Sequence, residues 1–196
     1  MNDPEPRSLP PSYFDDLYRA DDDPWNFETS EYEASKYAAT LAALPRARYR
    51  AALEIGCSIG VLTERLAERC DALLAVDVAE QALGRARARS RHLRQVRFEP
   101  MQFPRELPDG RFDLTLLSEV GYYWSPDDLA LARRRLIELL EPGGHLLLVH
   151  WTPYVAEYPL TGDQVHDAFL ADVGAKLRHL QARREERYRL DLFERT

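Results

Sequence analysis

The residues best suited to chemistry lie where apolar segments of the chain end. The apolar run "AALEI" leads into the loop "GCSIG", residues 56–60, and the run "ALLAVDV" carries Asp77 near its end, seventeen residues after Gly60. A glycine-rich turn between a strand and a helix lets backbone amides approach a ligand closely. An acid at the end of the next strand can accept hydrogen bonds from ribose hydroxyls. These positions predict a site for a nucleoside-containing ligand.

Each residue of the loop has a part in that site. Gly56 supplies the tight turn, and Gly60 allows the following helix to pack closely. The small side chains of Cys57 and Ser58 let a ligand reach the backbone. The loop alone fits either NAD or S-adenosylmethionine (SAM), but Glu54 favours SAM. A buried acid repels the pyrophosphate of NAD and attracts the ammonium and sulfonium groups of SAM.

A second reactive group follows the apolar run at residues 111–120, which contains Ser118 and Glu119 near its end. A carboxylate here can anchor an ammonium group or take the proton of a reacting amine. His150, near the end of the run "HLLLVHW", is the alternative base. The neighbouring aromatic side chains can line an acceptor pocket or attract a cation over their rings: Tyr122, Tyr123, Trp124 and Trp151.

Other catalytic chemistries find no support in the sequence. The five histidines, at positions 92, 145, 150, 166 and 179, lack metal-ligand spacing, so we expect no metal. Neither a G-x-S-x-G elbow nor a P-loop is present. The two cysteines, Cys57 and Cys70, form no disulfide framework, which favours a reducing cytoplasm.

The composition predicts an ordinary globular domain without a membrane span. The chain has 196 residues, of which 45% are hydrophobic and 30% charged. We expect a flexible leader over residues 1–11, where the polar, proline-rich sequence has no signal core, and one domain over 12–196. The net charge of −7 argues against nucleic acid as a partner. The arginine-rich run at 84–97 reads as a solvated helix face and strand edge, with an RNA-contacting patch as the alternative.

Apolar runs and helical patterns alternate along the chain, which predicts a parallel sheet covered by helices on both faces. The expected strands are 51–55, 72–78, 95–100, 111–120 and 145–151; the expected helices are 60–70, 79–90, 127–144 and 162–174. Residues 176–195 read as a closing β-hairpin that turns near 184–186, which would place an antiparallel strand in the sheet. A helical cap over 12–46 precedes the sheet, and its longer helix begins at a capping box of Ser30 and Glu33.

Residues 53–83, "LEIGCSIGVLTERLAERCDALLAVDVAEQAL", resemble the first motif and its acidic successor in class I SAM-dependent methyltransferases. Two further segments, "DPWNFETSEYEASKYAATLAALP" and "YPLTGDQVHDAFL", are similar to the nodulation protein NodS-like group. The resemblance implies a Rossmann-like α/β fold with a seven-stranded, mostly parallel sheet in the order 3-2-1-4-5-7-6 and one antiparallel strand.

The same resemblance assigns cofactor contacts. It implies that SAM lies in the loop of Gly56 to Gly60, that Asp77 holds the ribose, and that Val78 lies against adenine. Met101 and Gln102 follow the third strand, where such enzymes often place an aspartate on the adenine amino group. Ser58 replaces the commoner middle glycine. The remaining expected contacts come from the N-terminal cap and from the fourth strand: Trp25, Tyr32, Lys36 and Ser118.

NodS-like enzymes methylate the free amine of a deacetylated chitooligosaccharide, so the resemblance implies an amino sugar or similar small amine as acceptor. Glu119, or alternatively His150, would be the base, and Tyr122, Tyr123 and Trp151 would contact the acceptor. Three other functions stay open: a small-molecule O-methyltransferase, a SAM-binding protein without turnover, and an NAD-dependent enzyme. The expected partner is a small molecule, with no nucleic acid and no membrane.

Overall fold

The computed structural model describes residues 6–196, which are built around one sheet of seven strands in the order β3-β2-β1-β4-β5-β7-β6. The strands are β1 (Ala52–Ile55), β2 (Leu73–Asp77), β3 (Val96–Pro100), β4 (Phe112–Ser118), β5 (Leu140–Trp151), β6 (Leu177–Arg184) and β7 (Tyr188–Arg195). Strands β1 to β5 pair in parallel, whereas β7 is antiparallel to β5 and β6. The predicted strand order and reversed strand are confirmed.

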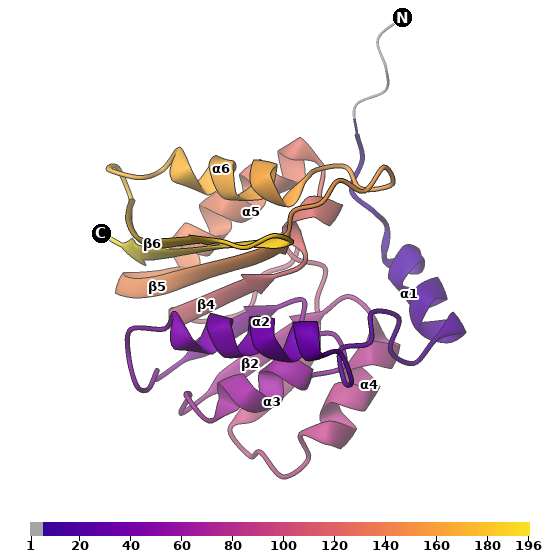
Figure 1. Cartoon of the computed structure of the whole chain (residues 1–196). Helices are drawn as coiled ribbons and strands as arrows, with labels where there is room; N and C mark the ends of the chain where they lie inside the picture. The colour runs from indigo at the N-terminus through magenta and orange to yellow at the C-terminus, as the bar shows by residue number, and fades with distance from the viewer. Residues whose placement is uncertain (1–5) are drawn as a thin grey trace, which may run out of the picture.

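Helices cover both faces of the sheet (Figure 1). The helices are α1 (Pro11–Ala20), α2 (Glu31–Ala42), α3 (Val61–Ala67), α4 (Glu80–Arg89), α5 (Pro126–Leu139), α6 (Gly162–Leu170) and the 3-10 turn η1 (Gly121–Tyr123). Figure 1 shows α2, α3 and α4 on one face and α5 and α6 on the other. Strands β1 and β4 are therefore buried along their whole length, which explains their continuous apolar character.

Several boundaries differ from the sequence-based expectation: α6 ends at Leu170 rather than at 174, and the largest difference lies where α5 meets β5. Helix α5 ends at Leu139, and β5 begins at Leu140 rather than at 145, because Leu140 already pairs with Phe112 before a register shift in the ladder. Gly144 permits this path, since a Cβ there would lie 2.8 Å from the Glu141 carbonyl oxygen. Residues 101–111, between β3 and β4, form no helix. This connection therefore leaves room beside the carboxyl ends of the strands.

Helices α2 and α6 each begin at a residue whose side chain accepts a backbone amide of the first turn. Ser30 accepts the Glu33 amide at 3.2 Å, as predicted, but the Glu33 carboxylate accepts the Lys36 ammonium at 2.9 Å instead of returning to Ser30. The predicted capping box is thus only half formed. The reciprocal box lies at α6, where Thr161 and Gln164 exchange backbone-to-side-chain bonds of 2.8 and 3.2 Å.

The N-terminal segment is bonded to the body of the protein from Ser8 onward. The Ser125 amide donates to Ser8 Oγ at 2.7 Å, and the Leu9 amide donates to the Tyr123 carbonyl at 2.9 Å. Ser8 and Leu9 belong to the leader expected over residues 1–11. Residues 1–5 of that leader lie outside the part that the structure describes. The boundary expected at residue 12 thus falls within α1, which starts at Pro11.

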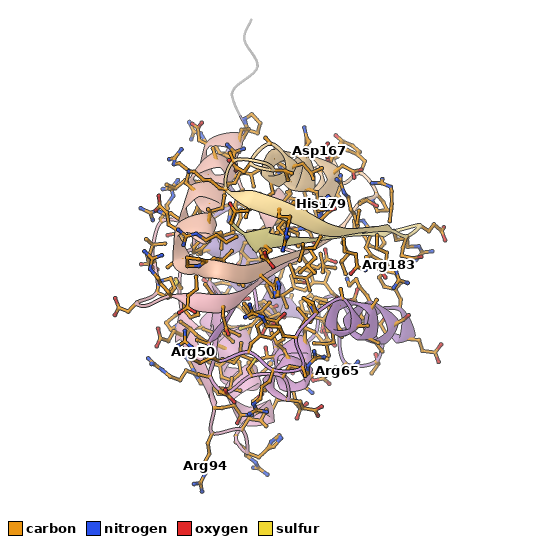
Figure 2. All side chains as sticks on the ribbon, turned by 90° about the vertical axis from the view of Figure 1, so that its left-hand side faces the viewer. Arg50, Arg65, Arg94, Asp167, His179 and Arg183 are labelled. Carbon is orange, nitrogen blue, oxygen red and sulfur yellow. The ribbon has the colours of Figure 1, made fainter. Side chains whose placement is uncertain are left out.

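The arginines of α4 face carboxylates of the N-terminal segment and of their own helix. Arg85 pairs with Asp22, Arg89 with Glu28, and Arg87 with Glu80. Arg94, later in the same run, points away from the body of the protein (Figure 2). No helix in residues 6–196 has the length and apolarity to cross a membrane.

Candidate functional site

A cavity of about 440 Å³ lies at the carboxyl ends of the strands, where a parallel sheet is expected to bind its ligand. Its volume is in the range of small-molecule sites, roughly 300–1,000 Å³. Most of the predicted site residues line it: Trp25, Tyr32, Lys36, Gly56, Ser58, Asp77, Val78, Met101, Gln102, Ser118, Glu119, Tyr122, Tyr123 and Trp151. Their individual roles stay predictions. The remaining four, Glu54, Cys57, Gly60 and His150, lie behind its wall.

The glycine loop forms one side of the cavity in a conformation that excludes side chains. Gly56 has a φ of +79°, and a Cβ there would lie 2.0 Å from Val120 Cγ2. Gly60 has the same φ, and a Cβ there would lie 2.9 Å from the Cβ of Ala86 in α4. The predicted close packing at Gly60 is present, and Gly56 also permits the loop to pack against the residue before η1. Ser58 also has a positive φ, of 51°.

Asp77 is fixed at the end of β2 by two backbone amides. Its Oδ2 accepts the Ser58 amide at 2.8 Å, and its Oδ1 accepts the Ala79 amide at 2.9 Å. Burial raises the pKa of Asp77, and these amides oppose that rise. Each carboxylate oxygen keeps a further lone pair, so the group can still accept hydroxyl hydrogens from the cavity. Gln102 lines the same side of the cavity.

One of the two roles predicted for Glu54, contact with a cationic ligand, requires its side chain to face the cavity. The side chain does not line the cavity. It is 2% exposed and lies beside Thr63 at the start of α3. Burial is the main cause that raises its pKa to about 8. Cys57 is likewise buried behind the loop. Glu54 can therefore orient the loop from behind, but it cannot touch a cationic ligand.

The raised pKa of Glu54 predicts a pH-dependent stability. Between its ordinary value near 4.5 and about 8, the folded chain keeps a proton that the unfolded chain releases. Stability is thus fully present at acid pH and is lost as the pH rises toward 8. Relative to Glu54→Gln, the wild-type free energy of unfolding should fall by about 1.4 kcal/mol per pH unit within this window. Urea unfolding at several pH values measures it; parallel curves for the two proteins would contradict the assignment.

Glu119 is the centre of a polar cluster in the cavity, at the end of β4. Its carboxylate accepts Lys36 Nζ at 2.5 Å, the Tyr122 hydroxyl at 2.7 Å and the Trp151 amide at 2.8 Å. Lys36 also donates to Glu33. Burial lowers the pKa of Lys36, but the two carboxylates outweigh it and raise that pKa overall. Lys36 thus bridges two carboxylates, and a second cation, Arg187, lies 6.0 Å from the centroid of the neighbouring Tyr32 ring.

Aromatic rings enclose this cluster. The ring of Tyr122 stacks on Tyr158 at 5.1 Å between centroids, with 7° between their planes. Tyr32 lies edge-on to Trp151 at 5.9 Å, and Lys36 Nζ lies 5.3 Å from the centroid of the Tyr32 ring. Among the described residues, the buried Tyr32 hydroxyl has no hydrogen-bond partner.

Several residues that line the cavity were not predicted: Phe14, Tyr18, Phe27, Val120, Tyr158 and Arg187. Tyr18 forms a hydrogen bond to Ser58, which joins α1 to the glycine loop. Phe14 and Tyr18 are four residues apart and share one face of α1. That spacing was the signal that could have placed α1 over the site.

His150 is wrong as the alternative base, because the structure does not bring it to the cavity. Its side chain is fully buried on β5, and its Nε2 accepts the Gly121 amide at 3.1 Å. Burial lowers the pKa of His150 well below its ordinary range. The ring therefore has no path to an acceptor proton, and Glu119 is the remaining predicted base.

The strand order, the glycine loop and the acid at the end of β2 define the class of protein: this is the fold of the class I SAM-dependent methyltransferases. The profile of the Nodulation protein S (NodS) family matches residues 14–155, and the chain belongs to that family. The predicted resemblance is confirmed.

Individual relatives agree with this assignment. Nodulation protein S of Rhizobium tropici is 35% identical over 65% of this chain and 55% of its own length. The N-methyltransferase NodS of Bradyrhizobium japonicum, solved with S-adenosyl-L-homocysteine (SAH), has a TM-score of 0.82 at 25% identity, over 92% of this chain and 96% of that one. A protein from Pseudomonas syringae has a TM-score of 0.74 at 38% identity, over 85% and 100%. The chain thus spans just over half the length of the first curated relative.

The residues present fit SAM as the cofactor. The loop of Gly56 leaves no room for a side chain beside the cavity, and Asp77 offers free lone pairs to it. Within residues 6–196, no group of His, Cys, Asp and Glu side chains is arranged to hold a metal ion.

Proposed function

We propose that the chain transfers a methyl group from SAM to the amine of a small acceptor, an amino sugar or a deacetylated oligosaccharide. The observation that carries the proposal is the cluster of Glu119, Glu33 and Lys36, which places two carboxylates and aromatic walls in the same cavity as the glycine loop. A carboxylate-rich site attracts an ammonium group, and aromatic faces suit both a cation and a sugar ring.

Two sets of residues have separate roles in this proposal. Asp77 and the loop of Gly56 hold the nucleoside end, and Glu119 holds the acceptor amine against the walls of Tyr122 and Trp151. Bound SAM supplies a methyl carbon activated by positively charged sulfur. The acceptor nitrogen would take this methyl group, and the sulfur would keep the electron pair of the broken carbon–sulfur bond. Glu119 accepts the proton that the nitrogen loses.

Positioning is the main contribution of the protein to such a transfer, and it can be worth roughly 7–11 kcal/mol. The three hydrogen bonds on Glu119 fix its carboxylate relative to Tyr122 and Trp151, which supports this role. We also propose the cytoplasm as the site of the reaction, since the buried thiols of Cys57 and Cys70 are unpaired.

Calorimetric titration with SAH tests the cofactor part. Asp77→Ala should weaken SAH binding by about 3 kcal/mol, or roughly 10²-fold, because charged hydrogen bonds to the ribose and the support of the loop are both lost. Asp109→Ala, an exposed carboxylate in the β3–β4 connection, is the matched control and should bind normally. Binding of NAD, or full SAH affinity in Asp77→Ala, would refute the assignment.

A transfer assay with deacetylated chitooligosaccharides tests the acceptor part, with the fully acetylated sugars as control. Mass spectrometry should locate the new methyl group on nitrogen in the deacetylated sugar and find none in the control. A methyl group on oxygen would favour the O-methyltransferase alternative. Tight SAH binding without transfer to any amine would favour a SAM-binding protein without turnover.

A further inference from the structure

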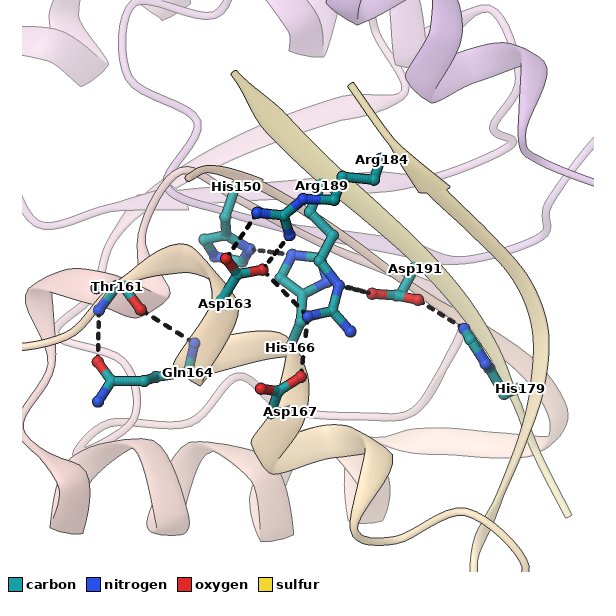
Figure 3. A network of polar contacts seen from close by, with 10 residues as sticks. All are labelled: His150, Thr161, Asp163, Gln164, His166, Asp167, His179, Arg184, Arg189 and Asp191. Carbon is teal, nitrogen blue, oxygen red and sulfur yellow. Dashed lines mark hydrogen bonds and ion pairs between the residues drawn. The ribbon is translucent and has the colours of Figure 1, made fainter. Parts of the chain in front are cut away.

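A hydrogen-bonded row of buried polar side chains connects β5, α6 and β7 (Figure 3). It joins His150 on β5, His166 on α6 and Asp191 on β7, each with no exposed surface. His150 Nδ1 and His166 Nε2 are 3.1 Å apart, and His166 Nδ1 is 2.6 Å from Asp191 Oδ2. None of these three residues lines the cavity. The function proposed above leaves them without a role.

The contacts admit one arrangement of hydrogens. The Gly121 amide donates to His150 Nε2, so this nitrogen carries no hydrogen and His150 must carry one on Nδ1. That hydrogen points to His166 Nε2, which must therefore be bare. His166 then carries its hydrogen on Nδ1 and donates it to Asp191. Both rings are neutral, and every bond of the chain points from Gly121 toward Asp191.

At one end of this hydrogen-bond network, Asp191 is bound by side chains that reach the surface. Asp191 also accepts His179 Nε2 at 2.6 Å and Arg189 Nε at 2.8 Å. Arg189 reaches on to Asp167 at 2.9 Å. Asp191 therefore has three donors, and His166 cannot change its hydrogen-bonding direction without breaking a charge-assisted bond.

At the other end of this hydrogen-bond network, His150 binds the turn η1, which includes Tyr122 of the acceptor wall. Gly121 begins η1, and a Cβ there would lie 2.6 Å from Val165 of α6 and 3.1 Å from His150 Nε2. The next residue, Tyr122, donates to Glu119 and packs edge-on to His150 at 5.6 Å. Trp151, beside His150 on β5, donates its amide to Glu119. His150 thus touches the turn, and its neighbour in sequence holds the carboxylate.

We infer that His166 is a positioning residue for the acceptor site: through His150 it fixes the Gly121 turn, and with it the placement of Tyr122 against Glu119. Buried polar groups stabilise a unique arrangement only when every partner is present. Removing His166 leaves the His150 hydrogen unpaired in the core, which releases the turn. The kinetic part of this inference rests on the proposed function.

The test compares His166→Leu with Phe169→Leu, a core change on the same helix that leaves the chain of bonds intact. In His166→Leu, kcat/KM for the amine should fall at least about tenfold while SAH affinity stays within about twofold. His166→Gln should recover most of the loss, because its amide can accept from His150 and donate to Asp191. Equal losses in both leucine variants, or a parallel loss of SAH affinity, would overturn the inference.

Two measurements need no turnover and separate this inference from the proposed function. Nitrogen-15 NMR of wild-type histidines should show hydrogen on Nδ1 and none on Nε2 for both His150 and His166. A crystal structure of His166→Leu should show a shifted η1 and a broken bond between Tyr122 and Glu119. Hydrogen on either Nε2, or an unmoved turn, would overturn the inference even if no amine acceptor were ever found.

Discussion

Replacing Glu119 with glutamine is expected to lower methyl-transfer turnover by roughly 10²- to 10⁴-fold, the range for a lost acid–base group. The amide is nearly isosteric, so the cavity keeps its shape, but it cannot take a proton and no longer attracts an ammonium group. SAH binding should survive, because the hydrogen bonds of Asp77 go to the Ser58 and Ala79 amides and not to Glu119. Single-turnover assays paired with calorimetry measure both quantities.

The matched control is Glu157→Gln, which changes an exposed carboxylate on the loop between β5 and α6. Its turnover should equal that of the wild type. Unchanged turnover in Glu119→Gln would remove this residue from the mechanism. A loss of SAH binding in the same variant would show instead that the charge supports the cofactor rather than the acceptor.

A second large effect is expected for Gly56→Ala, which should weaken SAH binding at least tenfold. The added Cβ meets Val120 Cγ2 at 2.0 Å, and the φ of +79° disfavours any side chain. The loop must therefore move, and it carries the Ser58 amide that holds Asp77. Thermal unfolding and SAH titration measure the two consequences.

Gly110→Ala is the control that separates the backbone strain of a positive φ from the steric contact with Val120 in Gly56→Ala. Gly110 has a φ of +94°, but a Cβ there would meet no atom within 4 Å. This variant should lose about 1 kcal/mol of stability from backbone strain and bind SAH normally. Equal effects of the two substitutions on SAH affinity would mean that the contact between the loop and Val120 has no part in binding.

The central strands β1, β2, β4 and β5 were predictable because each contains a short apolar run, whereas β6 and β7 were read from two extended runs around a charged turn. The strand order came from the family resemblance, not from the runs themselves. The start of β5 was missed because Leu140 continues the apolar pattern of α5, and only pairing with Phe112 marks it as a strand. The glycine loop and Asp77 could also be predicted, because neighbouring residues in the sequence are enough to identify them.

The parts of the site that depend on tertiary contacts could not be read from spacing. His150 ends an apolar strand like a catalytic base, yet only the packing of α6 decides that it faces His166 instead of the cavity. Glu33 fits a capping box, but Lys36 is one turn away and takes its carboxylate. For His150 the partner that decides is His166, distant in the sequence, and for Glu33 it is the competing Lys36.

Under the proposed function, the backbone of Glu119 opposes stability to activity at one position. Its φ of +58° lies in the left-handed region, where a residue with a long side chain pays roughly 1–3 kcal/mol that glycine would not. Selection for thermal robustness alone would favour a residue that relaxes this conformation, and such a residue would lack the carboxylate. Variants evolved for heat tolerance should therefore leave Glu119 alone only while selection on turnover is maintained.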